Sequence, residues 1–375
     1  MMRRFQTRCK RNGVTLVELL VVATITLTLA AISVPAIKPM MESNLTSNAA
    51  SSVSTYLNRA RVRAMTSGRS CGVTFEFLDG TYDESYDKYS MESFNGAGSA
   101  SLVLYQVQTP PYYCGLEDGA VVSVVPGYDV QENGQVYRCL DFGSDNFAHE
   151  DSYWDHFLKY EKYPEIQFNN CGPFYQLRQL NGGGYGVASP KAEGLELPVK
   201  LNATFKIKRD PCATMTSPMG LPQGAVVDLE FSGQEGERYF GLGGDVTVMF
   251  SPAGNVEYVE YPKRERDQTT GVVTVATERT CPEDTLYFLI GRWDRISALG
   301  VARDSNWGRA SYAEDGLFNF EDVTNFWVTI NPRSGQVSTI EVNPPVNYFL
   351  EDDMTEQINE SREFGRLSKR NLGGH

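Results

Sequence analysis

The chain has 375 residues, of which 41% are hydrophobic and 22% charged, and its formal net charge is −13 at pH 7. This length is ample for a buried core and long enough for two subdomains. The acidic balance argues against a domain that binds nucleic acid or an anionic membrane surface over its whole face.

The first residues combine a basic segment with a long apolar one. The segment 14–37 is apolar except for Glu18, and five cations precede Gly13, namely Arg3, Arg4, Arg8, Lys10 and Arg11. About twenty apolar residues are enough to cross a bilayer, and cations beside such a segment stay on the cytoplasmic side. We therefore expect a transmembrane helix at 14–37, with the bulk of the chain outside the cytoplasm.

The residues from Gly13 to Leu20 read G-V-T-L-V-E-L-L. They resemble the cleavage and assembly signature of type IV prepilins and of the pseudopilins of type II secretion. The resemblance implies that a prepilin peptidase removes the leader 1–13 by cutting after Gly13. It also implies that the new N-terminal amine, on Val14 where the family more often has Phe, is methylated, and that Glu18 pairs with this amine on a neighbouring subunit.

The position of Glu18 makes physical sense for such a subunit. An acidic residue inside a membrane helix is unfavourable by about 2.5–3.5 kcal/mol. Val14 and Glu18 are four residues apart and share one helix face. Pairing the carboxylate with an amine of another subunit would remove two desolvation penalties together, so Glu18 is predicted to favour assembly.

Two other interpretations of this segment remain open. An ordinary signal peptide could be cleaved after the small residues at 34–36, and a plain signal anchor would not be cleaved at all. The apolar run is longer than the 7–15 residues of a signal peptide, and an acidic residue is out of place there.

The helix is expected to continue beyond the membrane as the amphipathic segment 38–67. Pro35 and Pro39 each remove a backbone donor, so a kink or local melting is predicted near the membrane exit. Gly68 is a natural residue to follow the helix end. One apolar stripe at three- and four-residue spacing would face the outer domain, formed by Leu45, Ala49, Val53, Leu57, Ala60 and Ala64.

The rest of the chain reads as short strands separated by Gly and Pro. We expect strands at 71–77, 102–107, 120–125, 198–207, 226–231, 246–250, 256–261, 272–276, 286–290, 326–330 and 337–342. The predicted class is α+β, with the N-terminal helix packed on a mainly antiparallel sheet or sandwich at 71–345. Within it, 78–192 is expected to be an insertion or extra lobe, and the charged segment 346–375 a mobile tail or at most a loose helix.

Two segments resemble each other, F-S-P-A-G-N-V-E from Phe250 and I-N-P-R-S-G-Q-V from Ile330, each a strand, a turn and a strand. Both are similar to elements of the type II secretion minor pseudopilin H and of FimT-like minor pilins. The stretch 57–75 also resembles the junction between helix and first strand in that group.

Seven cysteines are present, and Cys9 lies in the leader. An even set in an exported domain predicts disulfides, although six cysteines allow 15 pairings. Their long spacings without C-x-x-C disfavour zinc. The candidates for pairing are Cys71, Cys114, Cys139, Cys171, Cys212 and Cys281.

Other chemistry is sparse in the sequence. The histidines His149, His156 and His375 match no metalloprotease spacing, and neither a nucleophile elbow nor a phosphate loop is present. Calcium could bind Asp79, Asp83 and Asp87, but their spacing lacks the EF-hand pattern, so a solvated acidic loop is preferred. Neither a cofactor nor a resident metal is expected.

A local basic cluster at Arg59, Arg61, Arg63 and Arg69 could bind DNA, as in some FimT-like minor pilins, but packing against an acidic domain is the preferred interpretation.

The sequence thus predicts a non-enzymatic minor pilin or pseudopilin of a type II secretion or type IV pilus-like fibre. Its expected partners are other subunits, the prepilin peptidase and the inner-membrane assembly platform. It would sit in the bacterial inner membrane as a single-pass protein with a periplasmic domain, then join an extracytoplasmic fibre. The alternatives are a DNA-uptake minor pilin and a signal-anchored extracytoplasmic protein of other activity.

Overall fold

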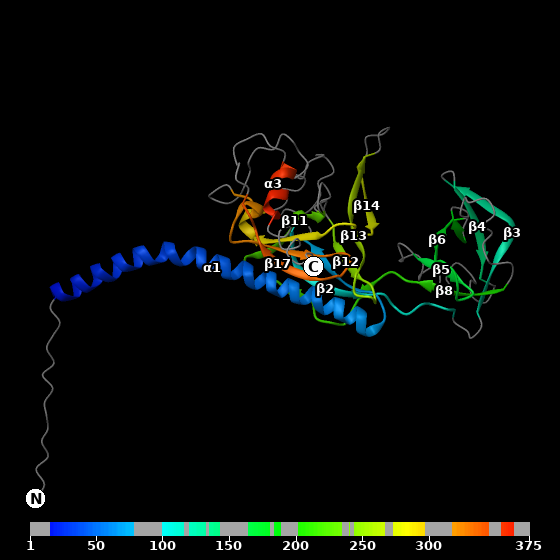
Figure 1. The fold of residues 1–375 in the computed structure, drawn as a ribbon, viewed down its shortest axis with the longest axis horizontal. Helices are drawn as coiled ribbons and strands as arrows, with labels where there is room; N and C mark the ends of the chain where they lie inside the picture. Colours follow the sequence, from blue (N-terminus) through cyan, green and yellow to red (C-terminus); the bar gives the residue numbers. More distant parts are fainter. Residues whose placement is uncertain are drawn as a thin grey trace, which may run out of the picture.

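The computed structural model describes residues 16–78, 100–115, 120–132, 135–142, 164–180, 184–188, 202–234, 240, 244–266, 273–296, 317–344 and 354–363. They form an N-terminal helix, a main sheet that packs against it and a small barrel beside the sheet (Figure 1). The predicted α+β class is confirmed, since a helix is followed by a mostly antiparallel β domain.

The helix α1, Leu16–Ser67, contacts the sheet along its C-terminal part. Its contact face is the predicted apolar stripe, with Leu45 partly buried and the following residues fully buried: Ala49, Val53, Leu57, Ala60 and Ala64. Burying a side chain the size of valine or leucine contributes about 1.5–3 kcal/mol, so the stripe fixes which side of α1 faces the sheet. After the helix, the N–H of Gly68 donates to the carbonyl of Ala64 at 3.1 Å with a φ of 65°, a conformation that glycine adopts without strain.

The main sheet has the strand order β14-β13-β12-β1-β2-β11-β15-β16-β17, and the short strands β9 and β10 pair with β2 beside β11. All of these pairs are antiparallel. The bounds are β1 Cys71–Phe77, β2 Ala100–Gln108, β9 Cys212–Ala213, β10 Met219–Gly220, β11 Ala225–Gln234, β12 Val246–Phe250, β13 Val256–Arg266, β14 Val273–Thr280, β15 Leu286–Arg292, β16 Phe326–Ile330 and β17 Val337–Glu341.

The inner face of the sheet forms one hydrophobic core with α1. This core takes side chains from both ends of the sheet, for example Val259 of β13 and Val328 of β16. Phe75 of β1 and Phe288 of β15 stack at 4.4 Å in its centre. Because strands from both ends contact one helix, the sheet curves around α1.

The outer face of the sheet is covered near β11, β15 and β16 by two 3-10 helices, η1 Trp293–Arg295 and η3 Asn319–Glu321, and by α3, Met354–Ser361. Ile358 of α3 packs with Trp327, and Arg362 is fully buried just beyond the helix. Within the segment 346–375, predicted to be a mobile tail or at most a loose helix, residues 354–361 form a short helix with buried contacts. The helix is short and mostly polar, so its sequence gave little periodic signal.

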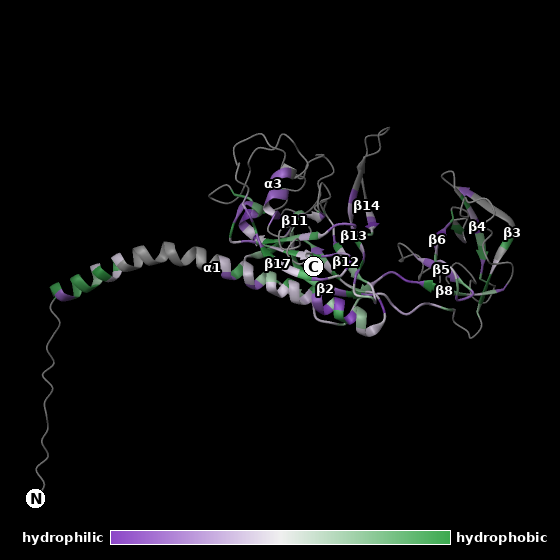
Figure 2. Cartoon of the chain, in the orientation of Figure 1, coloured by the Kyte–Doolittle hydropathy of each residue, from purple (hydrophilic) through white to green (hydrophobic). Residues whose placement is uncertain are grey.

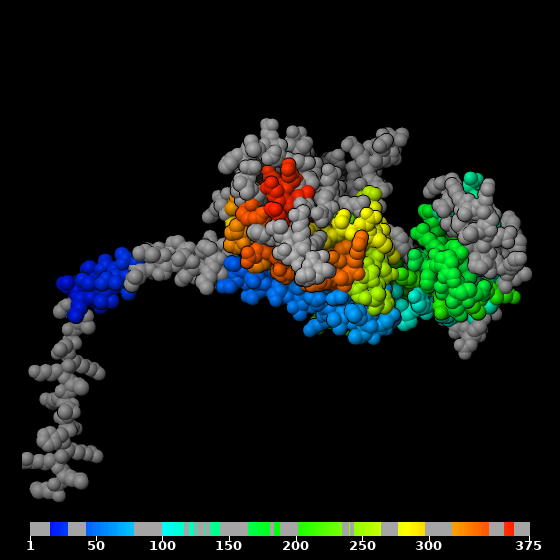
Figure 3. All heavy atoms as spheres, in the orientation of Figure 1, coloured from blue at the N-terminus to red at the C-terminus, as the bar shows by residue number. Residues whose placement is uncertain are grey.

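The second unit, called the lobe below, comprises residues 113–208 and contains a closed barrel with the order β3-β4-β7-β6-β5-β8. It has its own core, which includes Val122, Phe168 and Phe205, and it is a separate mass of atoms in the space-filling view (Figure 3). Its strands are β3 Val121–Glu132, β4 Gln135–Asp141, β5 Glu165–Phe168, β6 Tyr175–Gln179, β7 Tyr185–Ala188 and β8 Ala203–Lys208.

The lobe does not coincide with the insertion expected at 78–192. The strand β2 lies inside that range but belongs to the main sheet, and β8 lies beyond it but closes the barrel. The sequence could not mark these limits because strands of both units have similar lengths and similar turn residues.

Candidate functional site

The start of α1 carries an exposed apolar surface with one acidic residue, Glu18, in its first turn. The hydropathy colouring shows this stretch as a hydrophobic segment that projects from the domain (Figure 2). Its exposed large side chains are Leu16, Val17, Leu19, Leu20, Val21, Val22, Ile25 and Leu27. Such a contiguous patch indicates a surface that lipid or another protein covers.

The threonines of this stretch are adapted to apolar surroundings. Thr24, Thr26 and Thr28 donate their hydroxyls to carbonyls one turn earlier, at 2.7, 3.0 and 3.0 Å. A hydroxyl that is bonded within its own helix needs no water or partner, so these residues lower the polarity of the surface without leaving donors unsatisfied.

The structure describes only some of the other residues predicted to matter in this segment. Gly13 and Val14 lie outside the described residues. Pro35 and Pro39 fall within α1, where the backbone is helical on both sides, and the bend predicted there stays a prediction. In the part of the chain that the structure describes, no helix is both long enough and apolar enough to cross a bilayer.

The candidate cysteines are spread over both units. Cys114, Cys139 and Cys171 belong to the lobe, and the other three to the sheet, where Cys71 is buried and Cys212 and Cys281 are exposed. Burial raises the pKa of the Cys71 thiol. Of these described residues, Cys71, Cys114, Cys171, Cys212 and Cys281 are free thiols in the structure, and disulfide pairing stays a prediction.

Two arginines of the basic cluster take part in packing. Arg61 donates from Nε to the carbonyl of Gly254 at 2.9 Å, and Arg63 donates to the hydroxyl of Thr216 at 2.9 Å. Arg59 and Arg69 are exposed. The contacts of Arg61 and Arg63 agree with the preferred interpretation that the cluster packs against the domain, and DNA binding by the cluster stays an alternative that these contacts do not test.

The residues considered for metal binding cannot be placed. Asp79, Asp83, Asp87 and the three histidines lie outside the described residues. Among the residues that are described, no three His, Cys, Asp or Glu side chains come together as a metal site requires.

A cavity of about 450 Å³ opens on the outer face of the sheet, beside Pro211. Thr74 and Thr247 share a hydrogen bond of 2.8 Å in its lining, and Tyr105 donates to Asp245 at 3.4 Å. Burial, with the nearby Asp245 carboxylate, raises the pKa of Tyr105.

The opposite wall of this cavity is Arg279, whose Nη2 lies 2.9 Å from Asp210 and 3.0 Å from Glu260. Its guanidinium lies over the ring of Tyr258 at 4.3 Å. The lining has more carboxylates than cations, which disfavours an anionic ligand. No sequence pattern predicted this cavity because its residues come from β1, β2, β12, β13, β14 and the chain before β9.

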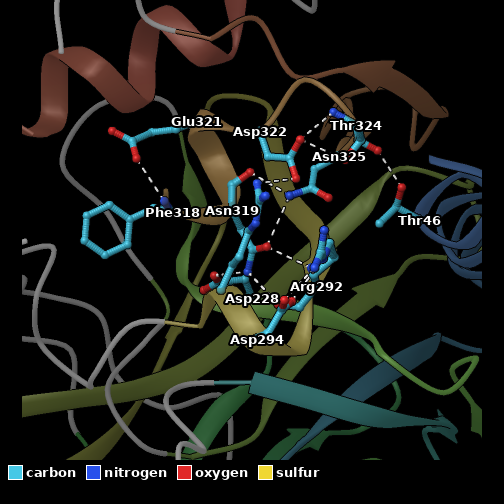
Figure 4. A network of polar contacts seen from close by, with 11 residues as sticks. Thr46, Asp228, Arg292, Asp294, Phe318, Asn319, Glu321, Asp322, Thr324 and Asn325 are labelled. Carbon is cyan, nitrogen blue, oxygen red and sulfur yellow. Dashed lines mark hydrogen bonds and ion pairs between the residues drawn. The ribbon is translucent and has the colours of Figure 1, made fainter. Parts of the chain in front are cut away.

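A second polar cluster is buried at the other end of the sheet (Figure 4). Asn319 lies at its centre: Nδ2 donates to Asp228 at 2.9 Å, and Oδ1 accepts from the N–H of Arg292 at 2.8 Å. Asn325 donates to the carbonyl of Asn319 at 2.9 Å. Asp228, Asn319 and Asn325 are fully buried, so this cluster stabilises the fold and is closed to a substrate.

The comparison with known proteins adds one match. Residues 8–34 match the family model described as the prokaryotic N-terminal methylation motif. No curated protein and no solved structure matches the chain. The N-terminal segment is thus similar to the methylation motif found in type IV prepilin-like proteins.

Proposed function

We propose that the chain is a structural minor pilin or pseudopilin, a subunit of a type II secretion or type IV pilus-like fibre. The methylation motif at 8–34 carries this proposal. The match covers the last part of the basic leader, Gly13, Val14 and Glu18, which are the residues that the resemblance assigns to processing and assembly.

The exposed start of α1 supports the same role. Leaving apolar side chains such as Leu19 and Ile25 in water is unfavourable by about 25 cal/mol per Å² of apolar surface. Lipid would cover them before assembly, and neighbouring helices in the fibre would cover them afterwards. Removing the leader would also leave a domain more acidic than the precursor, because five cations are lost.

In this proposal the precursor sits in the bacterial inner membrane, with its N-terminus in the cytoplasm and its sheet and lobe in the periplasm. The peptidase cuts after Gly13, Val14 is methylated, and the assembly platform moves the subunit into the fibre. The similarity of 57–75 and of the two turn segments to the pseudopilin H and FimT-like group supports a minor rather than a major subunit. The sheet and the lobe would then contact neighbouring subunits or exported cargo.

N-terminal sequencing and intact mass of the membrane-extracted protein test this proposal. We expect a mature chain that begins at a methylated Val14. Replacing Gly13 with leucine should leave the leader attached, whereas alanine there should be partly tolerated. A mature start at Ile37 would identify an ordinary signal peptide, and an uncleaved wild-type chain a plain anchor, and either result would contradict the proposal.

A further inference from the structure

Two short connectors, 109–112 and 209–211, join the lobe to the sheet. On the sheet side Gln108 pairs with Cys212, and on the lobe side Tyr113 pairs with Ile207. Four residues lie between these pairs on each strand, so the connectors form an antiparallel ribbon that keeps one register.

The ladder is interrupted within this ribbon. Pro110, Pro111 and Pro211 have no N–H to donate. The N–H of Thr109 donates to the carbonyl of Ser70 at 2.9 Å, so this residue is fixed to the sheet side. In the part of the chain that the structure describes, the next backbone hydrogen bonds between the two connecting strands are those between Tyr113 and Ile207, at 2.9 and 2.8 Å. A ribbon that lacks its ladder over this stretch bends more easily than the strands that it joins.

The lobe and the sheet do not share a core. The lobe has its own hydrophobic cluster around Phe168 and Phe205, and the sheet has its cluster around Phe75 and Phe288. Among the described residues, no hydrophobic cluster contains side chains of both units. Units that are joined without a large apolar interface are expected to move relative to each other.

Polar contacts connect the two units instead. Nζ of Lys208, at the end of β8, lies 2.9 Å from Glu257 of β13 and 3.7 Å from Glu165 of the lobe. Asp210 of the second connector lies 2.9 Å from Arg279 of β14. Burial lowers the pKa of Lys208, but its hydrogen bond and charge interaction with Glu257 outweigh this effect and raise it.

The space below the second connector is open. Asp210 and Pro211 form one side of the cavity of about 450 Å³ described above. The connector is therefore held to the sheet by the ion pair of Asp210 and does not pack closely against the sheet over this stretch. Movement of the connector would need no rearrangement of the hydrophobic core.

We propose that residues 110–112 and 209–211 are a hinge, and that the ion pairs Lys208–Glu257 and Asp210–Arg279 form a latch that holds the lobe in one orientation. The latch is weak because its ion pairs are partly exposed to water. One such pair shifts the equilibrium between orientations of the lobe by about five-fold or less. Salt or a charged partner can therefore release the lobe. This inference does not depend on the proposed function, since it uses contacts within one chain.

The distance distribution between spin labels on the two units tests this proposal. Labels are placed on the full-length chain at two exposed positions, Gln176 of the lobe and Thr339 of the sheet. They are attached through non-canonical amino acids, because the chain contains cysteines. A second pair of labels within the sheet, at Glu283 and Thr339, reports whether the sheet itself changes.

The key variant is the double substitution Lys208→Gln, Asp210→Asn. We expect one main distance in the wild type at low salt, and in the variant a several-fold increase in the population of other distances, up to about 25-fold if each of the two ion pairs contributes about five-fold. The control is Lys263→Gln, which breaks an ion pair of 3.1 Å to Glu278 within the sheet and should leave the distribution unchanged. In 1 M NaCl, where the Debye length is about 3 Å, the wild type should approach the variant.

Two results would overturn the proposal. If the variant and the wild type gave the same narrow distribution at both salt concentrations, the ribbon alone would fix the lobe. If the wild type were already as broad as the variant at low salt, no latch would exist. Should the variant fail to fold, the salt titration of the wild type still decides between these outcomes.

Discussion

The backbone N–H of Val256 donates to the carbonyl of Pro332 at 2.8 Å and joins two turns from opposite ends of the main sheet. One turn links β12 to β13 and the other links β16 to β17. These are the two segments whose sequences resemble each other. The contact closes the curved sheet over α1, and Arg61 of the helix donates to Gly254 in the first turn.

The two turns approach each other closely at Gly335, so Gly335→Ala is predicted to destabilise the fold. Gly335 has a φ of 62°, and a Cβ atom there would lie 1.9 Å from the carbonyl oxygen of Gly254. Because the oxygen belongs to the backbone, it cannot turn aside. We expect a loss of about 2–4 kcal/mol in the free energy of unfolding, measured by urea denaturation.

Gly68→Ala is the matched control for this substitution. Gly68 has a similar φ of 65°, but a Cβ atom there would meet nothing within 4 Å. Gly68→Ala therefore causes backbone strain alone, and its free energy of unfolding should fall by about 1–2 kcal/mol. Equal losses for both variants would show that the contact between the turns adds no constraint.

The buried Asp228 predicts how stability depends on pH. Burial raises its pKa from 3.8 to about 7, although the hydrogen bond from Asn319 acts in the opposite direction. The folded state therefore binds a proton that the unfolded state releases between these values. The stabilisation is complete below about pH 4 and is lost as the pH rises through 7, by at most about 4 kcal/mol.

Urea denaturation between pH 4 and 8, on wild type and Asp228→Asn, isolates this contribution. The amide cannot ionise, so the variant should lose less stability than the wild type as the pH rises. It should also be less stable at low pH, because the two side-chain oxygens of Asp228 accept from Nδ2 of Asn319 and from the N–H of Glu230, whereas an amide has only one oxygen to accept with. Parallel curves for the two proteins would show that Asp228 does not titrate in this range.

The buried contacts of Arg362, just beyond α3, predict that this residue is essential for stability. Its guanidinium donates to the carbonyls of Gln234 and Phe231, both at 2.9 Å, and lies over the rings of Tyr287 and Trp327. Lysine can replace neither the fork of donors nor the flat stacking surface. Arg362→Lys should lower the free energy of unfolding by about 2–4 kcal/mol, whereas the same change at the exposed Arg333 should stay within about 0.5 kcal/mol.

The separate cores predict that the lobe can be removed. Gln108 and Cys212 are paired neighbours, so a two-residue Asn-Gly turn can replace 109–211. The remaining protein should unfold in one cooperative transition and lose about 3 kcal/mol or less, because the lost contacts are partly exposed ion pairs and the hydrogen bond from Thr109 to the carbonyl of Ser70. Circular dichroism during heating would reveal a broad, non-cooperative transition if the sheet needs the lobe.

The sequence predicted the elements whose patterns are local. The strands at 71–77, 246–250 and 326–330 lie where expected, and Gly68 follows the helix end. Alternating burial or a glycine with positive φ leaves a signal within a few residues. The class of the fold followed from the order of these elements.

Features that depend on distant contacts could not be predicted. The strands β5–β7 have only four or five residues each and carry several Tyr and Gln residues, so their alternation is weak. Arg362 looked like a tail residue because its partners are 128 and 131 positions away. The candidate site shows the same division: the local motif around Glu18 was visible, but the cavity at Arg279 and the latch at Lys208 arise only from folding.

Glu18 gives the last prediction, which separates assembly from folding. It lies in the first turn of α1, well before the buried stripe that begins at Leu45. Glu18→Gln should therefore leave processing and the melting temperature of the domain unchanged, while crosslinking to co-expressed fibre subunits falls several-fold because the proposed charge pair is lost. Thr26→Val is the control: its hydroxyl is bonded within its own helix, to Val22 at 3.0 Å, so crosslinking should persist. If Glu18→Gln crosslinked as well as the wild type and the fibre still functioned, Glu18 would have no part in assembly.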